Sequence, residues 1–276
     1  MLMFVSAAAP VPTTAPLRLL RKADSSERTQ SAQAGYPAAQ TDFFEVFMEF
    51  LSNGFTLDIC AGAFPLSTDS MLLQDFVRLP ANARALDLGS GCGTLGVLLC
   101  AKDTACHVTG IELDETAHNA ALENIRRNAL QERMVSICAD LRMIPGDLIP
   151  GSFDCCVSNP PYYSGGPASS TAPLARRDDC CTTDALFAAA SKMLKYGGDF
   201  FLVHKPERLA QLCACAAAHS LEPKRLCTVR HKPDGQVSLI LLSCRKGGKP
   251  GLTWEEACLK DADGNPSQYY RSIYHI

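Results

Sequence analysis

An asparagine, two prolines and two tyrosines stand next to one another in the stretch FDCCVSNPPYYSGG, residues 153–166, directly after an apolar run. Proline fixes φ and lacks a backbone N–H, so Pro160 and Pro161 cannot continue a strand. Asn159 precedes a proline, which biases it towards an extended conformation. The sequence therefore predicts a stiff, open turn that presents a side-chain amide, a free carbonyl and aromatic rings. Such a turn is a candidate site for positioning a flat substrate group.

A second candidate site is the glycine-rich turn in ALDLGSGCG, residues 85–93. Asp87 is expected at the end of a strand, and Gly89, Gly91 and Gly93 follow it at alternate positions. Glycine lets a ligand lie against the backbone at the N-terminus of the following helix. The signal is weak by itself, because glycine turns follow many buried strands and the dinucleotide pattern G-x-G-x-x-G is not met.

Two further acidic residues strengthen this signal. Glu112 is expected to end the second strand, 19 residues after Gly93, where a carboxylate can accept both hydroxyls of a ribose. Asp140 is expected to end the third strand, where it is suited to contacting an adenine edge. Three acidic strand ends and a glycine turn together predict a cofactor that contains a nucleoside.

The elements that must position these residues alternate between strand and helix. Strands are expected at residues 83–91, 107–114, 134–140, 153–160, 198–205, 223–231 and 237–246, and helices at residues 94–102, 115–131, 182–197 and 206–220. This alternation predicts an α/β fold with a Rossmann-like, doubly wound, seven-stranded sheet that is mostly parallel. The last strand should be antiparallel, because it follows a hairpin through Pro233, Asp234 and Gly235. Ligands of such sheets bind at the carboxyl ends of the strands.

The net charge of −3 over 276 residues gives no global sign of nucleic-acid binding, but the charge is uneven. Residues 165–251 carry 13 Lys and Arg against 7 Asp and Glu, a balance of +6, so the remainder carries −9. A basic portion of this size could follow a phosphate backbone. Solvated helix faces explain it equally well without a supporting motif.

The 14 cysteines form no C-x-x-C pair, so neither a structural zinc site nor any other metal site is expected. Cys92, Cys100, Cys138, Cys155 and Cys156 lie in segments that are typical of a core, where cysteine acts as a small hydrophobe. Reduced thiols of this kind favour a cytoplasmic protein without disulfides.

The N-terminal region falls outside the strand and helix pattern. No segment reaches the length of a transmembrane helix, and residues 1 to about 40, which are rich in Ala, Pro, Ser and Thr, are expected to be largely disordered. TDFFEVFMEFL, residues 41–51, is expected to form a short amphipathic helix with Thr41 as its N-cap. We therefore expect an accessory extension at residues 1–47 and one domain at residues 48–276.

LDLGSGCG, GIELD, CAD and NPPYY, in this order, resemble the motifs of class I S-adenosylmethionine-dependent methyltransferases. The Asn-Pro-Pro-Tyr motif is similar to that of enzymes that methylate a planar sp² nitrogen. The resemblance implies S-adenosylmethionine as cofactor and catalytic roles for Asn159, Pro160 and Tyr162. The Asn159 amide oxygen and the Pro160 carbonyl would accept hydrogen bonds from an –NH₂ group, and Tyr162 would stack on its ring. Asn159 would also contact the cofactor.

FPLSTDSMLL (64–73), HKPERLAQL (204–212) and CRKGGKPGLTW (244–254) narrow the resemblance to the bacterial tRNA(Val) adenine-N6-methyltransferase family. Its substrate is N6 of the adenosine 3′ to the anticodon, which implies tRNA as partner. Residues 54–276 carry the similarity; Met48 resembles a family start, and Cys92 stands where the family often has Thr. Asp69 would either contact the cofactor or cap a helix. The residues expected at the substrate are Pro161, Tyr163, Arg176, Arg177, Arg245, Lys246 and Lys249.

Three other functions stay open on the sequence. A ribosomal RNA or DNA base methyltransferase shares the same catalytic turn. A release-factor glutamine methyltransferase uses the same geometry on a protein amide, although the roughly 80 residues before the first strand look too sparse for its usual helical domain. A non-catalytic RNA-binding module is the alternative from another class, and the intact Asn159, Pro160 and Tyr162 argue against it.

Overall fold

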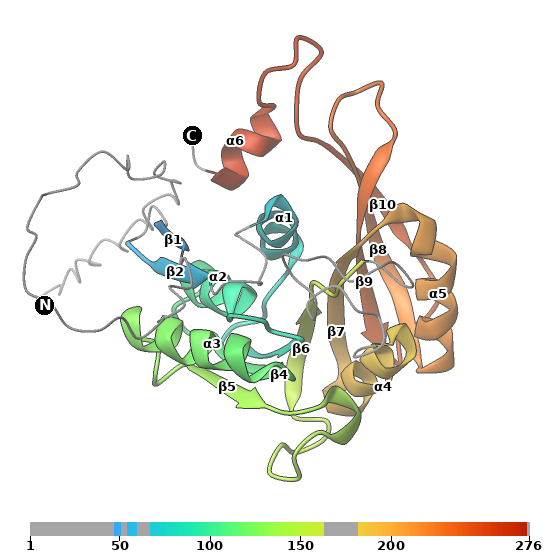
Figure 1. Ribbon diagram of the computed structural model, residues 1–276. Coiled ribbons are helices and arrows are strands. Elements are labelled where there is room, and N and C mark those ends of the chain that lie inside the picture. Colours follow the sequence, from blue (N-terminus) through green and yellow to red (C-terminus); the bar gives the residue numbers. More distant parts are fainter. Residues whose placement is uncertain (1–46, 51–53, 60–66, 163–181, 275–276) are drawn as a thin grey trace, which may run out of the picture.

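An eight-stranded sheet forms the centre of the computed structural model, which describes residues 47–50, 54–59, 67–162 and 182–274 (Figure 1). Its strands follow the order β10-β8-β9-β7-β6-β3-β4-β5. Their bounds are β3 (Arg84–Leu88), β4 (His107–Glu112), β5 (Met134–Cys138), β6 (Phe153–Ser158), β7 (Leu194–His204), β8 (Leu221–Arg230), β9 (Val237–Lys246) and β10 (Thr253–Cys258).

The strand directions confirm the expected mostly parallel sheet with one antiparallel strand. β9 runs antiparallel to both of its neighbours, β7 and β8, while the other pairings in this sheet are parallel. The expected count of seven strands was wrong, because β10 adds an eighth strand at the edge, parallel to β8. Its sequence TWEEAC carries two adjacent glutamates, which suits an edge strand and hides the alternation of a buried one.

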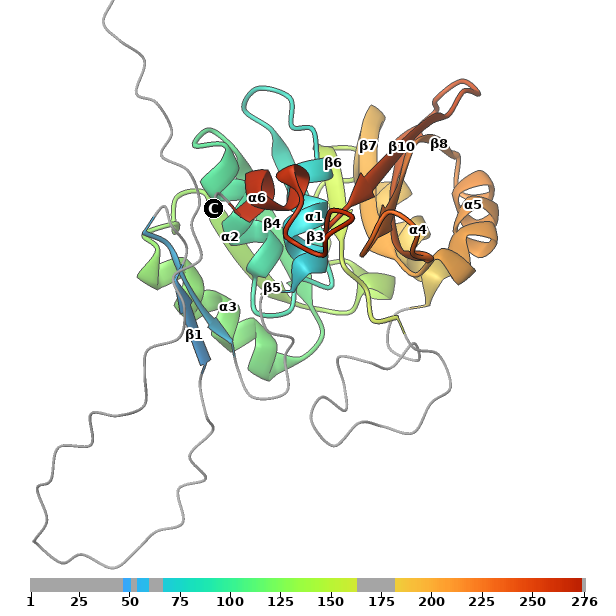
Figure 2. The ribbon, with the colours of Figure 1, turned by 90° about the horizontal axis from the view of Figure 1, so that it is seen from above.

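Helices cover both faces of the sheet, as a doubly wound fold requires (Figures 1 and 2). One buried cluster holds side chains from α1 (Thr68–Phe76), α2 (Thr94–Lys102), α3 (Glu115–Arg127) and α6 (Gln268–Tyr274). The other holds side chains from α4 (Thr183–Met193) and α5 (Leu209–Ala218). Two 3₁₀ turns, η1 (Leu141–Met143) and η2 (Pro206–Arg208), follow β5 and β7. α4 is shorter than expected because β7 begins directly after it, at Leu194.

Successive strand residues divide between the two clusters because side chains alternate across a sheet. Cys155 packs in the first cluster and Cys156 in the second, and both are buried. Burial raises the pKa of the Cys100 thiol to about 11. Cys138 does not fit the expected core role, because it is exposed at the end of the edge strand β5.

A small hairpin of β1 (Phe47–Phe50) and β2 (Thr56–Ile59) precedes the central domain. The helix expected at residues 41–51 was therefore wrong for residues 47–50, while residues 41–46 lie outside the described part of the chain. The two aromatic residues of β1 favour a strand, and the Asn53-Gly54 dipeptide is a hairpin signal that outweighed the helical period. Gly54 has a φ of 85°, a left-handed value that suits glycine in such a turn.

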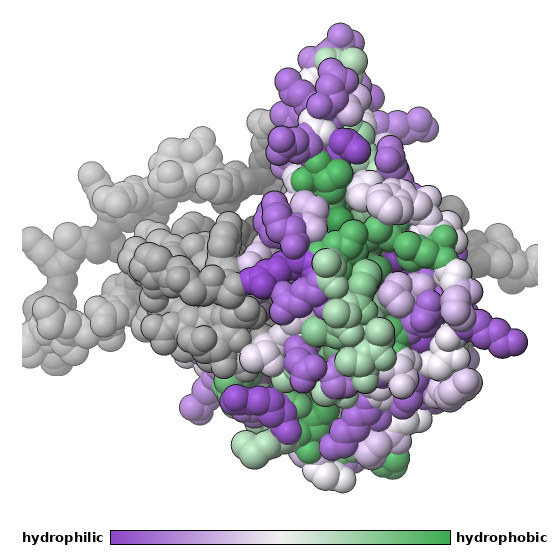
Figure 3. Space-filling view, turned by 90° about the vertical axis from the view of Figure 1, so that its right-hand side faces the viewer, coloured by the Kyte–Doolittle hydropathy of each residue, from purple (hydrophilic) through white to green (hydrophobic). Residues whose placement is uncertain are grey.

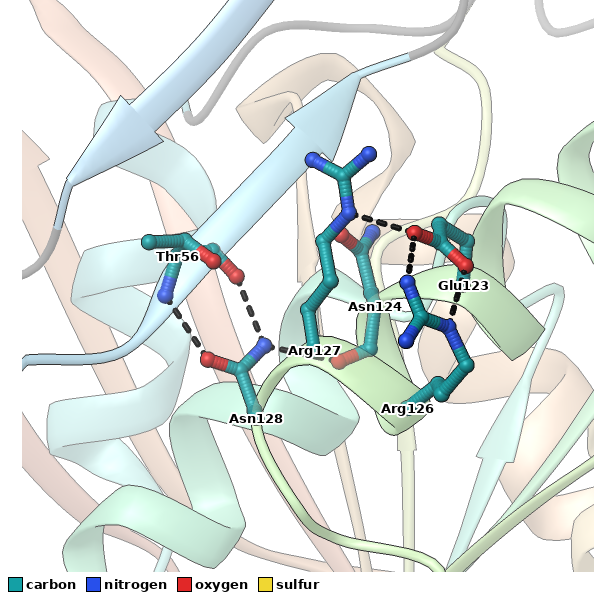
Figure 4. A network of polar contacts seen from close by, with 6 residues as sticks. All are labelled: Thr56, Glu123, Asn124, Arg126, Arg127 and Asn128. Atoms are coloured by element: carbon teal, nitrogen blue, oxygen red, sulfur yellow. Dashed lines mark hydrogen bonds and ion pairs between the residues drawn. The ribbon is translucent and has the colours of Figure 1, made fainter.

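The side chain of Asn128 ties this hairpin to the end of α3 (Figure 4). Its Oδ1 accepts a hydrogen bond from the Thr56 backbone N–H at 2.7 Å, and its Nδ2 donates to the Thr56 carbonyl at 2.7 Å. The amide thus bonds β2 as a neighbouring strand would. In the last turn of α3, Arg126 and Arg127 both donate to Glu123, an exposed cluster that contributes little to stability.

The exposed positions of α5 are alanines with one glutamine, Gln211, and Figure 3 shows a hydrophobic area on the side of the molecule that carries this helix. α5 reads LAQLCACAAA and has no charged residue.

Among the described residues, no helix combines the length and the apolar composition that crossing a bilayer requires.

Candidate active site

The carboxyl ends of five neighbouring strands bring the candidate residues together at one edge of the sheet. Asp87 lies in β3, Glu112 ends β4, Asp140 follows β5 and Asn159 follows β6. His204, at the end of β7, extends this edge on the other side. Parallel strands place their carboxyl ends side by side, so the sheet brings these residues of distant sequence to the ligand-binding edge of the fold.

The glycine turn after β3 has the left-handed backbone that was expected of it. Gly89, Gly91 and Gly93 have φ values of 73°, 55° and 81°. Gly93 is the N-cap of α2, and a Cβ there would stand 2.9 Å from the Met134 Cε atom. The turn therefore favours glycine by conformation at these three positions, and at Gly93 a Cβ would also press on the flexible end of the Met134 side chain. It leaves backbone N–H groups at the N-terminus of α2, a favourable place for an anionic or polar group.

Asp87 is a buried carboxyl group with neither oxygen hydrogen-bonded among the described residues. Burial, and after it the negative charge of Glu112, raise its pKa to about 8, a rise that the nearby Gly96 backbone N–H partly offsets. A buried carboxylate is costly unless a cation or a donor meets it. The α-ammonium group of S-adenosylmethionine is such a donor, so the open acceptor atoms of Asp87 fit that cofactor.

Glu112 is already engaged with the glycine turn. Its Oε2 accepts from the Gly91 N–H at 2.7 Å and its Oε1 accepts from the Asp114 N–H at 2.8 Å. Each carboxylate oxygen keeps a second lone pair, so the group can still accept hydrogen bonds from a ribose. The ribose contact stays a prediction.

Asp140 pairs with Arg142, a residue that sequence reasoning missed. The carboxylate accepts from the Arg142 backbone N–H at 2.8 Å and from its guanidinium Nε at 2.9 Å. These hydrogen bonds hold the pKa of Asp140 below its ordinary value. An adenine amine would have to share this carboxylate with Arg142, and the adenine contact also stays a prediction.

Two side chains of the turn after β6 and two of helix α1 form one hydrogen-bonded group. The Tyr162 hydroxyl lies 2.7 Å from Asp69 Oδ2 and 2.8 Å from Asn159 Oδ1. Asn159 Nδ2 donates to the Ser70 Oγ at 3.1 Å. Burial, the nearby charge of Asp69 and its hydrogen bond all raise the pKa of Tyr162, so its hydroxyl stays protonated.

The structure excludes one of the two roles that the sequence left open for Asp69, that of a helix cap. Ser67 is the N-cap of α1, and its Oγ accepts from the Ser70 N–H at 3.3 Å. Asp69 instead accepts from Tyr162, 93 residues away in the sequence. It does not cap the helix.

The Tyr162 ring is half-buried between polar neighbours that the sequence gave no reason to expect. Its centroid lies 5.3 Å from that of the His204 ring, and Lys205 Nζ lies 5.2 Å from the Tyr162 centroid. Asn159, Pro160 and Pro161 are also half-buried. The stacking of Tyr162 on a substrate stays a prediction.

The residues expected at the substrate are not brought together. Tyr163, Arg176 and Arg177 lie outside the described residues. Of the other four, Pro161 follows Asn159 in the turn after β6, whereas Arg245, Lys246 and Lys249 lie at the opposite end of the sheet from Asn159. β9 runs antiparallel, so Arg245 pairs with Asp199 while Ile240 pairs with His204, five residues farther along β7 and roughly 17 Å away at strand spacing.

These basic residues also have contacts within the chain. The Arg245 guanidinium donates to both oxygens of Asp199, at 2.9 and 2.8 Å. Lys246 Nζ donates to the Leu194 carbonyl at 2.8 Å. In the described part of the chain, no group of three or more His, Cys, Asp or Glu residues is arranged to hold a metal ion.

Comparison with known proteins adds a family to this geometry. Residues 60–212 match the model of the methyltransferase small domain. A protein of Tolumonas auensis named "tRNA1(Val) (adenine(37)-N6)-methyltransferase" is 31% identical over 228 residues, which cover 81% of this chain and 94% of that protein. A Bacteroides fragilis protein of the same name is 29% identical, with 66% of this chain and 77% of that protein covered.

The fold is similar to that of solved methyltransferases. A crystal structure described as a predicted O-methyltransferase from Agrobacterium tumefaciens superposes with a TM-score of 0.64 at 19% identity, covering 75% of this chain and 96% of that one. TYW2 from P. horikoshii, in complex with MeSAdo, superposes with a TM-score of 0.53 at 16% identity, with coverages of 74% and 72%. At these identities the likeness supports the fold alone.

Proposed function

The chain belongs to the methyltransferase small domain family, and we propose that it transfers a methyl group from S-adenosylmethionine to N6 of an adenosine in tRNA. The target is the adenosine next to the anticodon of a valine tRNA, and the relatives are named for adenine 37 of tRNA1(Val). Because tRNA is the substrate, the protein acts in the cytoplasm. The observation that carries the proposal is the position of the Asn159-Pro160-Pro161-Tyr162 turn beside the glycine turn and the buried Asp87.

The cofactor supplies an electrophilic methyl group on its sulfonium sulfur. Asp87 would hold the α-ammonium group, Glu112 would accept from the ribose hydroxyls, and Asp140 would accept from the adenine amine. The N-terminus of α2 and the backbone of Gly89, Gly91 and Gly93 would lie against the ligand. Each contact uses an acceptor or a donor that the described residues hold at this edge of the sheet.

The turn itself positions the substrate amine. Asn159 Oδ1 and the Pro160 carbonyl accept its two N–H groups, which points the nitrogen lone pair at the methyl carbon. The nitrogen–carbon bond would form as the carbon–sulfur bond breaks, with S-adenosylhomocysteine as the leaving group, and the amine would lose its proton to water afterwards. No strong base is needed, so positioning and charge placement supply most of the acceleration.

Contacts to tRNA complete the proposal. Pro161, Tyr162 and Tyr163 would contact the target base, and Arg176, Arg177, Arg245, Lys246 and Lys249 would contact phosphates, which position a nucleic acid without reading its sequence. An adenosine in an anticodon loop is single-stranded, so it can be splayed out for methylation.

The test is methyl transfer from labelled S-adenosylmethionine to total bacterial tRNA, followed by nucleoside analysis. The wild type should label N6-methyladenosine, and Asn159→Ala should label none while still binding the cofactor. Asn265→Ala is the matched control, because Asn265 is exposed between β10 and α6. Label found only in ribosomal RNA, DNA or release factor would keep the chemistry and change the substrate. Binding of RNA with no transfer to any of them would indicate a non-catalytic module.

We also propose that residues 1–47 are dispensable for this activity and that residues 48–276 form the catalytic domain. The boundary falls one residue inside β1, which begins at Phe47. A chain that starts at Met48 should retain the kcat of the full chain, and loss of transfer in that chain would refute the boundary.

A further inference from the structure

The first turn of α1 contacts the catalytic turn through two side chains. Asp69 and Ser70 are neighbours in sequence, and their side chains meet Tyr162 and Asn159, respectively, across more than 85 residues. Ser70 is buried, with 6% of its surface exposed, and its Oγ accepts from Asn159 Nδ2. This bond fixes the amide so that Asn159 Oδ1 faces away from α1's Ser70 and towards the Tyr162 hydroxyl.

Two oxygens compete for the single proton of the Tyr162 hydroxyl. Asp69 Oδ2 stands 2.7 Å from the hydroxyl oxygen and Asn159 Oδ1 stands 2.8 Å from it. A hydroxyl donates one hydrogen bond. A bond to an ionised carboxylate is roughly twice as strong as one between neutral groups. The proton therefore rests with Asp69, and Asn159 Oδ1 is the weaker competitor.

Asn159 Oδ1 is also the atom that must receive the substrate amine. A proton donated by Tyr162 would occupy one of its two lone pairs and weaken its hold on the amine. The charge on Asp69 prevents this by drawing the proton to the other side of the hydroxyl. Asp69 and Asn159 thus compete for the Tyr162 proton, and Tyr162 and the substrate amine compete for the lone pairs of Asn159 Oδ1.

We propose that Asp69 is a positioning residue for methyl transfer, which holds the Tyr162 hydroxyl proton and so leaves Asn159 Oδ1 available to the substrate amine. This inference rests on the proposed function of the turn. It assigns to Asp69 an action on Asn159 that passes only through the hydroxyl of Tyr162. Removing that hydroxyl should therefore relieve the damage done by removing Asp69.

The first test is a double-mutant cycle of Asp69→Ala and Tyr162→Phe, with kcat for tRNA and KM for S-adenosylmethionine measured for each protein. Asp69→Ala should lower kcat by roughly ten- to a hundredfold, with Asp69→Asn between it and the wild type, because hydrogen bonds to charged groups are worth that factor. Adding Tyr162→Phe to Asp69→Ala should raise kcat again by about tenfold. KM for the cofactor should stay unchanged.

Asp75→Ala is the matched control, because Asp75 lies on the same helix and also accepts from a tyrosine hydroxyl, that of Tyr269 at 3.3 Å, outside the site. It should leave kcat at the wild-type value. A double variant no faster than Asp69→Ala would overturn the proposal, because Asp69 would then act on the ring or on the helix and not on the shared proton. Thermal unfolding of each variant identifies any that fails to fold.

The second test needs no methyl transfer, so it separates this inference from the proposed function. The side-chain amide of Asn159 is followed by NMR in ¹⁵N-asparagine-labelled protein. Asp69→Ala should shift this resonance when residue 162 is Tyr and leave it in place when residue 162 is Phe. A shift of the same size in both backgrounds would overturn the inference, even if the wild type proved inactive on tRNA. Wild-type inactivity with the expected shifts would refute the proposed function alone.

Discussion

At the carboxyl ends of the strands the carboxyl group of Asp87 is buried with no hydrogen bond among the described residues, whereas near the amino ends Asp154 and Asp199 each hold a basic side chain. Lys195 donates to Asp154 at 2.6 Å, and Arg245 donates to Asp199 at 2.8 Å. Asp140 at the carboxyl end is also paired, with Arg142, so the open acceptor among the acidic residues described there is Asp87. A buried group without a hydrogen bond, more than charge itself, distinguishes the end that binds a ligand.

Neutralising Asp87 tests this comparison with the largest expected effect. Asp87→Asn should weaken S-adenosylmethionine binding by roughly ten- to a hundredfold at pH 8, because a hydrogen bond to a charged partner is lost. In the cofactor-free protein, by contrast, the substitution should raise the free energy of unfolding at this pH. The folded pKa of about 8 lies above that of an unfolded aspartate, so wild-type stability falls as pH rises from about 4 to about 8.

Asp87→Asn should abolish that fall and exceed the wild type by a few kcal/mol at pH 8, since one pKa unit corresponds to about 1.4 kcal/mol. Calorimetric titration of the cofactor and urea unfolding between pH 5 and pH 9 measure the two effects. Asp147→Asn is the control, because Asp147 is exposed in the loop before β6 and should change neither quantity. Equal pH slopes for wild type and Asp87→Asn would contradict the open-acceptor account of the carboxyl end.

Gly93→Ala disturbs the same end without touching a charge. The φ of 81° and the 2.9 Å approach to Met134 predict a loss of about 1–3 kcal/mol in the free energy of unfolding. Gly146→Ala is the matched control, because nothing lies within 4 Å of a Cβ there. Denaturant unfolding of both variants checks the difference, and equal stabilities would show that the turn tolerates a side chain.

Arg245→Ala breaks a pair at the amino end and should have a smaller effect. The Arg245 side chain is 48% exposed, so the expected loss of stability is only about 0.2–1 kcal/mol. Cofactor affinity should not change. The measurement is urea unfolding at low and high salt, with Asp199→Ala completing a double-mutant cycle. A marked loss of cofactor binding would mean that the two ends are coupled.

Lys249→Ala should have no measurable effect on stability. Lys249 is exposed, and its ammonium group has no partner in the described part of the chain, although its carbonyl accepts from Lys224. Its expected effect is on tRNA affinity, whose logarithmic salt dependence should fall by about one unit. Filter binding over a range of salt concentrations measures this slope. Lys249→Arg keeps the charge and should keep the slope; unchanged binding of Lys249→Ala at every salt concentration would remove Lys249 from the interface.

Much of the central sheet could be predicted because its elements have strong local patterns. Helix α2 and strand β9 have the bounds expected from the sequence, residues 94–102 and 237–246. Local patterns gave wrong predictions where contacts with distant parts of the chain decide the conformation or the burial of a residue. Residues 47–50 pair with β2 instead of forming a helix, and Cys138 is exposed because β5 is an edge strand.

The candidate site divides in the same way. Glycines after β3 and the turn after β6 lie next to their strands in the sequence, so their position followed from the fold class. The bond between Asp69 and Tyr162 joins segments 93 residues apart, and no local pattern reports it. The expected antiparallel direction of β9 already implied that its last residues, Arg245 and Lys246, lie far from Asn159. The local run of basic residues shows only charge and does not show at which end of the sheet that charge lies.

The buried carboxyl group of Asp87 makes cofactor binding a proton-releasing event. With a pKa of about 8, this group carries a proton in most molecules at neutral pH. An ammonium partner requires the ionised form, so each binding event expels close to one proton into the solvent. The apparent affinity for S-adenosylmethionine then drops by up to about tenfold for each pH unit below 8. Acidification would slow methylation in this way before any residue of the catalytic turn changes its charge.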